Sequence, residues 1–282
     1  MEKGVWIMRI ISGSLSGAFP KDNAVIDGDV CIVKYCLKEE NIIYPLHITE
    51  YLSCKLIEQM GYPVQSTSLM NIYGKEAVKI KKFEKMISPI LSMGEYTLET
   101  YNIPGKSLNN NTIEILESAL KKESNAVDRV FEIIIIDSLI LNTDRHLGNV
   151  AVYPDGLLAP LYDNGLSLGV VEYFSGKALE PNEVIEKYKM QFRHKTKRMT
   201  WDVFGKRYNG LISEVTESTI NNLKDAIRNT NIEDIIVTIP TEMQKEWSDY
   251  LHWVKTLYNK NKEVVLNRLN DLSKNGGLVR WI

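Results

Sequence analysis

The sequence predicts an α+β protein of two lobes, a small β-rich N-terminal lobe over residues 1–83 and a larger, mostly helical C-terminal lobe over residues 84–282. Short β-branched runs bounded by Gly, Asp and Pro fill the first part, whereas longer segments with three- and four-residue apolar spacing fill the second. The 282 residues are 44% hydrophobic and 25% charged, which is ordinary globular composition. Each lobe is therefore long enough to bury its own core.

The first strands flank a flexible loop. Val5–Ile11 is apolar and partly β-branched, and a Ser- and Gly-rich stretch follows it directly. Val30–Tyr35 reads as a second strand after the turn residues Asp27–Asp29. The simplest arrangement is a hairpin that joins these two strands through the glycine loop.

A helix is predicted over Leu46–Met60, because its apolar residues recur at helical spacing and Gly61 and Pro63 stop the pattern. A strand, a turn and a second strand follow between Val64 and Phe83. These elements complete the predicted N-terminal lobe.

The rest of the chain favours helices. Asn111–Lys122 opens with a capping pair, and Ala126–Leu141 predicts a buried helix, since it is too long for one strand despite its four consecutive isoleucines. Val150–Tyr153 and Leu157–Leu161 flank a turn and predict a short hairpin. Four aromatic residues near the end have helical spacing typical of core: Trp247, Tyr250, Trp253 and Tyr258.

The charge balance excludes a global attraction to polyanions. The chain has 34 basic and 36 acidic residues, a formal charge of -2, so we expect neither membrane association nor direct DNA binding. No apolar run approaches the ~20 residues that span a bilayer, and the N-terminus lacks a signal-peptide pattern. We expect a soluble, cytoplasmic protein.

Three cysteines, Cys31, Cys36 and Cys54, form no C-x-x-C pair. This suits buried thiols in a reducing compartment. Two thiols five residues apart without a neighbouring histidine set do not predict a zinc site.

The residues that carry chemistry begin at Asp144. Phosphoryl transfer requires a carboxylate near the attacking hydroxyl and oxygen ligands for a metal ion. Protein kinases supply these with a loop Asp, an Asn five residues on, and a second Asp near a Gly after the next hairpin. Asp144, Asn149, Asp163 and Gly165 have this spacing, in this order, around the predicted hairpin. The pattern predicts a phosphoryl-transfer site.

The same mechanism predicts two upstream parts. Lys34 lies inside an apolar strand, where an inward ammonium needs an anion, although snorkelling at a strand edge is the alternative. Glu50 on the following helix is the first choice for a carboxylate partner, and Glu58 is the second. A glycine loop over the phosphates is expected from Ser12, Gly13, Ser14, Ser16 and Gly17.

Six motifs together resemble the HipA-like Ser/Thr protein kinases, most closely the short members related to the cell-translocating kinase. They are Gly17-Ala18-Phe19-Pro20-Lys21, Ile32-Val33-Lys34, Thr49-Glu50-Tyr51, Lys81-Lys82-Phe83, Asn142-Thr143-Asp144-Arg145-His146-x-x-Asn149 and Tyr162-Asp163. The resemblance runs from about Ile11 to Ser167 and implies a two-lobed protein-kinase-like fold.

The resemblance also implies chemistry. It implies ATP with Mg²⁺ (or Mn²⁺), and a toxin kinase that phosphorylates a protein serine or threonine, often in a translation component such as an aminoacyl-tRNA synthetase. Asp144 would be the catalytic base, Asn149 and Asp163 the metal ligands, and Lys34 the phosphate lysine. The backbone of Lys81, Lys82 and Phe83, continuing to Glu84, would be the hinge under adenine.

Regulation is expected from the same resemblance. Family members autophosphorylate a serine of the glycine loop, which makes Ser12, Ser14 and Ser16 candidates, and a phosphate there would switch activity off. Only about a dozen residues precede the loop, where larger HipA proteins carry a subdomain. Control by that subdomain is then either missing or supplied by a separate regulatory or antitoxin chain.

Two alternatives remain open. Arg145 and His146 also fit the loop of phosphoinositide kinases, which makes a lipid or small-molecule kinase one alternative. A catalytically silent nucleotide-binding partner module is the other. A basic run, Arg193–Arg198, is either a solvated face or a surface for an acidic protein or a tRNA-bearing complex.

Overall fold

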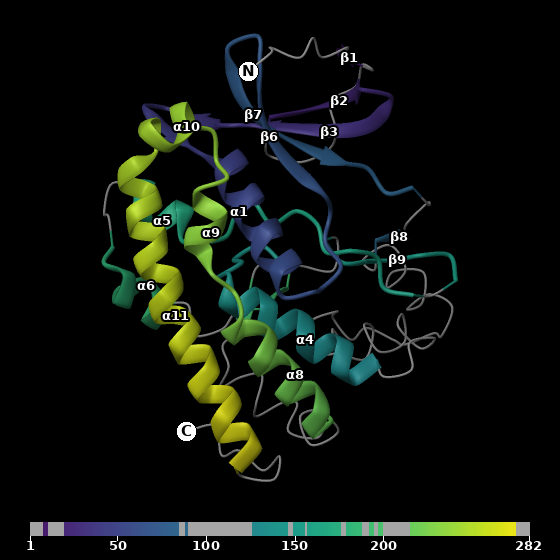
Figure 1. Ribbon diagram of the computed structural model, residues 1–282, viewed down its shortest axis with the longest axis vertical. Helices are drawn as coiled ribbons and strands as arrows, with labels where there is room; N and C mark the ends of the chain where they lie inside the picture. Colours follow the sequence, from purple (N-terminus) through teal and green to yellow (C-terminus); the bar gives the residue numbers. More distant parts are fainter. Residues whose placement is uncertain are drawn as a thin grey trace.

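The structure is a computed structural model. It describes residues 8–10, 20–84, 88–89, 126–145, 149–155, 157–175, 179–187, 192–194, 197–199 and 215–274. One antiparallel sheet forms the upper part of the molecule in Figure 1, and helices form the lower part. The α+β, two-lobed prediction is confirmed in this arrangement.

The sheet of the upper lobe has five strands. In spatial order they are β1 (Met8–Ile10), β2 (Lys21–Ile26), β3 (Asp29–Tyr35), β7 (Lys75–Lys81) and β6 (Thr67–Ile72). The sequence-based hairpin was wrong, because it omitted β2. The glycine-rich stretch leads from β1 into β2, and β3 pairs with β2 across a turn at Asp27 and Gly28. The first three residues of β2 are polar, so its apolar alternation is too short to stand out.

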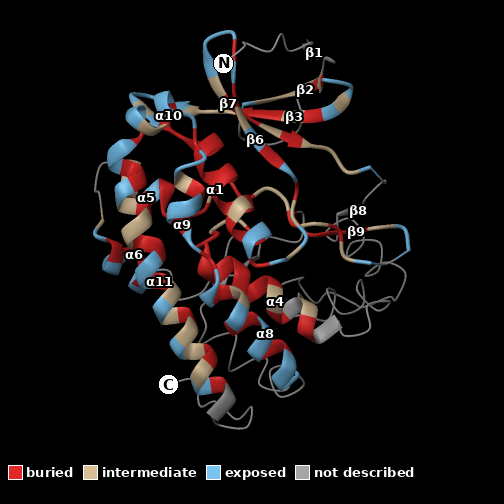
Figure 2. Ribbon diagram, in the orientation of Figure 1, coloured by how far each residue is buried: buried red, intermediate tan, exposed pale blue. Residues whose placement is uncertain are grey.

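Both faces of the sheet are covered. On one face a small cluster of buried residues includes Ala24, Ile26 and Val33, and the other face meets the helix α1 (Leu46–Gln59). Figure 2 shows α1 as buried over most of its length, because it lies between the sheet and the C-terminal helices. The predicted helix is confirmed, and Gly61 just beyond it has a φ of +78°.

The strand–turn–strand prediction is also confirmed. β6 and β7 pair across Tyr73 and Gly74, whose φ values are +50° and +81°. Between β3 and α1 the chain forms a small hairpin of β4 (Leu37–Glu39) and β5 (Ile42–Tyr44).

The lower lobe is helical. Its described helices are α4 (Ala126–Leu139), α5 (Val170–Phe174), α6 (Pro181–Lys187), α8 (Glu217–Arg228), α9 (Ile232–Ile236), α10 (Thr241–Glu246) and α11 (Ser248–Lys274). α4 confirms the predicted buried helix. Asn261 on α11 donates its amide to the carbonyls of Ser138 at 2.8 Å and Leu139 at 2.9 Å, so α11 satisfies the end of α4.

Short strands complete the lobe. β8 (Ser88–Pro89) pairs with β9 (Ala151–Val152), and β10 (Phe192–His194) pairs with β11 (Lys197–Met199). The predicted 150–161 hairpin is reduced to a bridge between Val152 and Leu158, with Tyr153 N donating to Leu157 O at 2.8 Å. The basic run, Arg193–Arg198, begins in β10 and ends in β11, and its side chains lie outside the described ones. The predicted helix 111–122 also lies outside the described residues.

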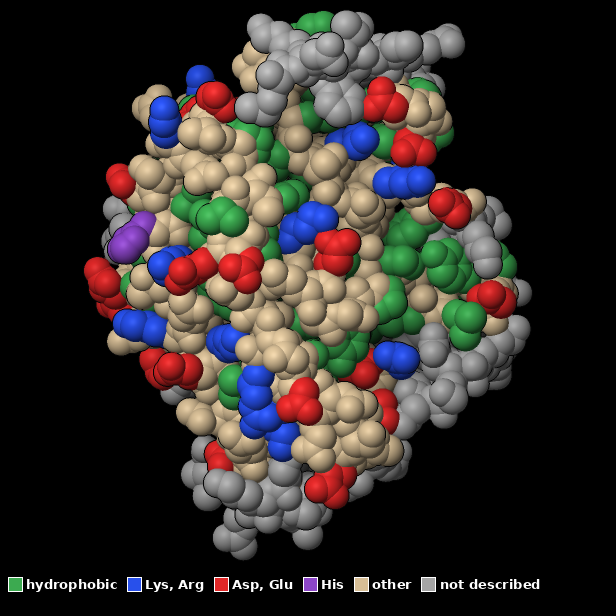
Figure 3. Space-filling model, in the orientation of Figure 1, with side chains coloured by type: hydrophobic (Ala, Val, Ile, Leu, Met, Phe, Trp, Pro, Cys, Tyr) green, Lys and Arg blue, Asp and Glu red, His purple; other side chains and the backbone are tan. Residues whose placement is uncertain are grey.

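A single large apolar cluster connects α1, α4, α8, α9 and α11. Trp247, Tyr250 and Tyr258 are buried in it, which confirms these three aromatic residues as core, whereas Trp253 is partly buried against it. Charged residues of both signs are mixed over the face shown in Figure 3. Within the described part of the chain, no helix combines the length and apolar character that a membrane span requires.

Candidate active site

Lys34 is the centre of the site. It lies on β3, is 8% exposed, and directs its ammonium at two carboxylates. Nζ is 2.7 Å from Glu50 Oε2 on α1 and 2.7 Å from Asp163 Oδ1 on the segment after β9. Three segments that are distant in sequence therefore meet at one ammonium group.

The charges of this triplet stabilise one another. Burial lowers the pKa of Lys34, but the two carboxylates outweigh it, so the pKa lies above its ordinary value. Burial raises the pKa of Asp163, but Lys34 outweighs it and the pKa is lowered. Lys34 and Asp163 are therefore both ionised at neutral pH. The second-choice residue, Glu58, is exposed and pairs with Lys55 at 2.6 Å.

α1 docks onto the segment that carries Asp163. The second oxygen of Glu50 accepts the backbone N–H of Asn164 at 2.9 Å, and the Thr49 hydroxyl donates to the carbonyl of Gly165 at 2.7 Å. A Cβ on Gly165 would lie 3.2 Å from Glu50 Oε2, the oxygen that faces Lys34. A glycine at this position lets the helix and the segment approach closely.

The loop that carries Asp144 and Asn149 follows α4. Asp144 N donates to the Asn142 side-chain oxygen at 3.0 Å, and the Asn149 side-chain amide donates to the Asp144 carbonyl at 3.1 Å. The backbone of Thr143 donates to Leu166 O at 3.0 Å. The loop is thereby closed on itself and joined to the segment beyond Asp163.

Arg145 connects the two halves of the site. Its side chain is fully buried and its Nε donates to Asp137 Oδ2 on α4 at 3.0 Å. Nη1 donates to the carbonyls of Asn149 at 2.8 Å and Tyr162 at 2.7 Å. Nη2 donates to Asn164 Oδ1 at 2.5 Å. One guanidinium thus spans α4, the Asp144 loop and the Asp163 segment.

The sequence alone did not predict this role of Arg145, nor the contribution of Asp137. The available signal was an acid inside the isoleucine-rich helix, because a buried carboxylate requires a partner. Burial raises the pKa of Asp137, and Arg145 opposes this shift. The pair is a structural support for the loop rather than a reacting group.

The remaining expected site residues fall into two sets. Ser12, Gly13, Ser14, Ser16, Gly17 and His146 lie outside the described residues. The segment Lys81–Glu84 is described, and Lys82 N donates to Val30 O at 3.0 Å. The Phe83 ring lies edge-on to Tyr162, with centroids 5.7 Å apart. A cavity of about 260 Å³ adjoins this segment, between Val64 and Tyr153.

Comparison with known proteins identifies a family for the chain. Residues 13–247 match the family described as the HipA-like C-terminal domain. No curated protein matches the chain. Among solved structures, the proinflammatory kinase CtkA of Helicobacter pylori is similar with a TM-score of 0.62 and 18% identity, over 94% of this chain and 96% of that one.

HipA of Shewanella oneidensis MR-1, solved with HipB and operator DNA, is similar with a TM-score of 0.64 and 16% identity, over 93% of this chain and 67% of that one. At these identities the two structures establish a shared kinase-like fold. Because the family match covers most of the sequence, the chain belongs to the family of HipA-like C-terminal domains.

Proposed function

We propose that the protein transfers the γ-phosphoryl group of ATP to a serine or threonine hydroxyl of a protein, with Mg²⁺ (or Mn²⁺) bound. The observation that carries the proposal is the contact of Lys34 with both Glu50 and Asp163, at 2.7 Å each. This ammonium is held beside a carboxylate, at the junction of the sheet and the Asp144 loop, where a phosphate-binding lysine of a kinase would act.

The donor set fits a magnesium ion. Asp163 gives one oxygen to Lys34, and its side chain is 32% exposed, so the carboxylate also faces accessible space. The Asn149 amide donates through its nitrogen to the Asp144 carbonyl, which leaves its oxygen as the atom able to act as a ligand. Two carboxylates against one ammonium also leave the triplet with net negative charge. Oxygen ligands and negative charge suit Mg²⁺.

Each residue then has a distinct task. Lys34 binds phosphate oxygens, and Glu50 keeps its ammonium in place. Asp144, which is half-buried, accepts the proton of the attacking hydroxyl. Arg145 holds the Asp144 loop and the Asp163 segment in register. A Mg²⁺ ion held by Asn149 and Asp163 would neutralise phosphate charge and orient the γ-phosphoryl group.

Three parts of the proposal rest on the family resemblance. The glycine loop would cover the phosphates, and the Lys81–Glu84 backbone would contact adenine. Ser12, Ser14 or Ser16 would accept a phosphate that switches activity off. We also propose that the boundary between the two lobes lies at residue 83.

Substrate and partner are proposed by analogy. The solved HipA of Shewanella oneidensis is in complex with HipB and operator DNA. We propose that this protein is a toxin kinase controlled by a separate regulatory or antitoxin chain. We propose that its substrate is a translation component, such as an aminoacyl-tRNA synthetase.

The test is labelled-phosphate transfer from ATP into proteins of a cell lysate, with phosphoinositide vesicles as a separate acceptor. We expect protein labelling that Asp144→Asn abolishes while ATP binding, measured by thermal shift, persists. Asp234→Asn, an exposed acid on α9, is the matched control and should label as wild type does. Label only in the vesicles would favour the lipid kinase. Full transfer by Asp144→Asn would overturn the mechanism, and intact mass after ATP treatment would reveal loop phosphorylation.

A further inference from the structure

The C-terminal helices contact α1 along its length. The contacts come from residues 231–247, a segment that includes α9 and α10 and that we call the strap. In Figure 1, α9 lies against α1, and α10 lies at the level of the sheet. Because α1 carries Glu50, any segment that holds this helix also determines where the Glu50 carboxylate lies.

Two hydrogen bonds mark the course of the strap. Asn231 donates its backbone N–H to Gln59 Oε1, in the last turn of α1, at 3.0 Å. The hydroxyls of Thr238 and of Tyr51, near the middle of α1, are 2.8 Å apart. The strap therefore runs antiparallel to α1, from the carboxyl end of the helix toward its amino end.

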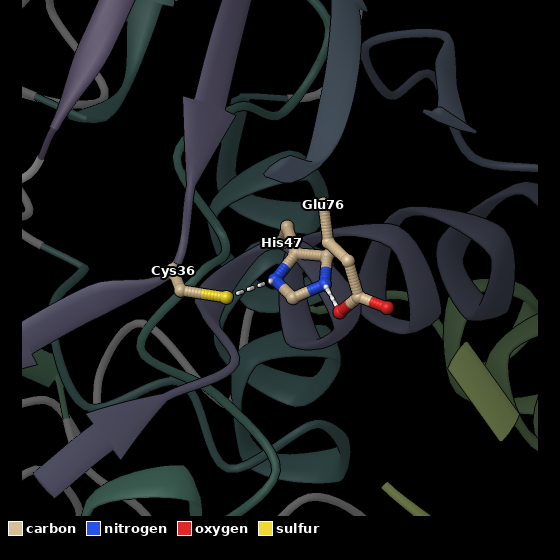
Figure 4. A group of neighbouring side chains, drawn as sticks. All are labelled: Cys36, His47 and Glu76. Atoms are coloured by element: carbon tan, nitrogen blue, oxygen red, sulfur yellow. Dashed lines mark hydrogen bonds and ion pairs between the residues drawn. The ribbon is translucent and has the colours of Figure 1, made fainter. Parts of the chain in front are cut away.

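Trp247 ends the strap beside the first turn of α1. Its indole N–H donates to Glu76 Oε2 on β7 at 2.8 Å, and its ring lies edge-on to His47 with centroids 6.2 Å apart. His47 is fully buried, and its Nε2 lies 3.0 Å from the same Glu76 oxygen. Figure 4 shows the imidazole between Glu76 and Cys36, whose Sγ is 3.4 Å from Nδ1. One carboxylate oxygen thus joins the strap, the sheet and the start of α1.

The inner side of the strap is apolar. Ile232, Ile235, Ile239, Met243 and Trp247 recur at three- and four-residue spacing, and all five are buried in the cluster that also contains the apolar residues of α1. This burial would be lost if the strap left α1. Apolar contact has no preferred direction, so the hydrogen bonds are what fixes the position of α1 along its axis.

The start of α1 depends on these contacts because the helix is not capped there. Pro45 occupies the N-cap position without a side-chain hydrogen bond, and the first turn contains no acidic residue. Glu50 follows His47 by three residues, which is about one helical turn. A displacement of the first turn would therefore carry Glu50 away from Lys34.

We propose that Trp247 and Thr238 are positioning residues for phosphoryl transfer. They hold α1 so that Glu50 stays paired with Lys34. In protein kinases this lysine–glutamate pair must be in place for transfer, and the position of the helix that carries the glutamate controls activity. Here the helix is held by a segment of the same chain. The inference rests on the proposed kinase function.

The first test is hydrogen exchange of α1, followed by mass spectrometry on protein without nucleotide. Trp247→Phe keeps a ring beside His47 but removes the indole N–H, and Tyr51→Phe removes the hydroxyl that meets Thr238. We expect each variant to exchange the amides of residues 46–59 roughly 3- to 10-fold faster, the effect of one lost hydrogen bond on a local opening. Unchanged exchange in both variants would overturn the proposal.

Two matched controls remove the same chemical groups away from α1. Trp253→Phe removes an indole N–H that donates to Leu179 O at 3.2 Å, and Tyr258→Phe removes a hydroxyl 2.5 Å from that of Thr230. Both controls should leave exchange of residues 46–59 unchanged. If Trp247→Phe does not fold, exchange of wild type in low urea decides the outcome, since α1 and the strap should open together. Amides of α1 that stay protected after those of the strap have exchanged would refute the proposal.

The second test separates positioning from a general loss of stability. The double variant Trp247→Phe/Tyr51→Phe should lower kcat several-fold. In a Glu50→Gln background the same two substitutions should have no further effect, because the carboxylate that they position is gone. An equal loss of kcat in both backgrounds would show a structural role alone and would refute the positioning role. Absence of transfer by wild type would refute the proposed kinase function, whereas the exchange result does not depend on kinase activity.

Discussion

Replacing Arg145 with Lys tests whether one guanidinium holds the site together. The guanidinium reaches four groups: the Asp137 carboxylate, the carbonyls of Asn149 and Tyr162, and the Asn164 side-chain oxygen. An ammonium keeps the charge but has three N–H donors that radiate from one atom. At least one buried acceptor must lose its partner.

The magnitude follows from these contacts. Leaving a buried acceptor unpaired costs about 1–3 kcal/mol, and hydrogen bonds from a charged donor are worth about 1.5–3 kcal/mol each. We therefore expect Arg145→Lys to lower the free energy of unfolding by roughly 2–4 kcal/mol. A shift of about 1 Å in the Asp144 loop would also slow phosphoryl transfer by roughly 100-fold.

Urea denaturation measures the first effect and single-turnover transfer the second. The control is Arg228→Lys, which alters an exposed pair with Asp225 at 2.9 Å, and it should change stability by less than about 0.5 kcal/mol. If Arg145→Lys unfolds like the control and transfers phosphate at the wild-type rate, the guanidinium does not organise the site.

Three further predictions concern packing and pH. Gly165→Ala places a methyl group 3.2 Å from Glu50 Oε2, so we expect about 1–3 kcal/mol of lost stability by urea denaturation and weaker ATP binding. Unchanged ATP affinity would contradict the proposed close approach. Gly169→Ala, with a φ of +64° and Trp253 2.7 Å from the new Cβ, should cost more stability than Gly28→Ala. Gly28 has a φ of +87° and no atom within 4 Å of a new Cβ, so equal losses of stability would show that the Trp253 ring moves aside in Gly169→Ala. Burial raises the pKa of Tyr250 and Tyr258 above the unfolded value of about 10. The fold therefore holds more protons than the unfolded chain above that value, and stability should fall as pH rises through it. Ultraviolet titration should show a tyrosine fraction that ionises only on unfolding; complete ionisation of the native protein would refute this.

Much of the fold could be predicted where the signal is local. α1 has helical spacing and a glycine stop, and β6 and β7 flank a Tyr73-Gly74 turn. β2 was missed because three of its six residues are polar. Its strand conformation depends on pairing with β1 and β3, which no local pattern records.

In the candidate site, too, local patterns predict only part of the arrangement. The spacing of Asp144, Asn149 and Asp163 predicts a chemical class, phosphoryl transfer, because the three residues occur in the order that kinases use. The partner of Lys34 was a choice between Glu50 and Glu58, and only Glu50 meets it in the structure. Helical periodicity alone could not distinguish Glu50 from Glu58, because it does not fix the position of α1 along its axis relative to the sheet.

What sequence could not supply is the set of contacts between distant residues. Lys34 and Asp163 are 129 positions apart, and Thr49 and Gly165 are 116 apart. These contacts exist because the apolar residues of α1 fit between the sheet and the C-terminal helices, which fixes the helix along its axis. Arg145 then fixes the Asp163 segment against α4 through Asp137. The position of the ammonium of Lys34 therefore depends on two things: the packing of α1, which places Glu50, and the contact of Arg145 with Asp137, which places Asp163. The packing of α1 against the sheet also brings Cys36, His47 and Glu76 together from three separate elements.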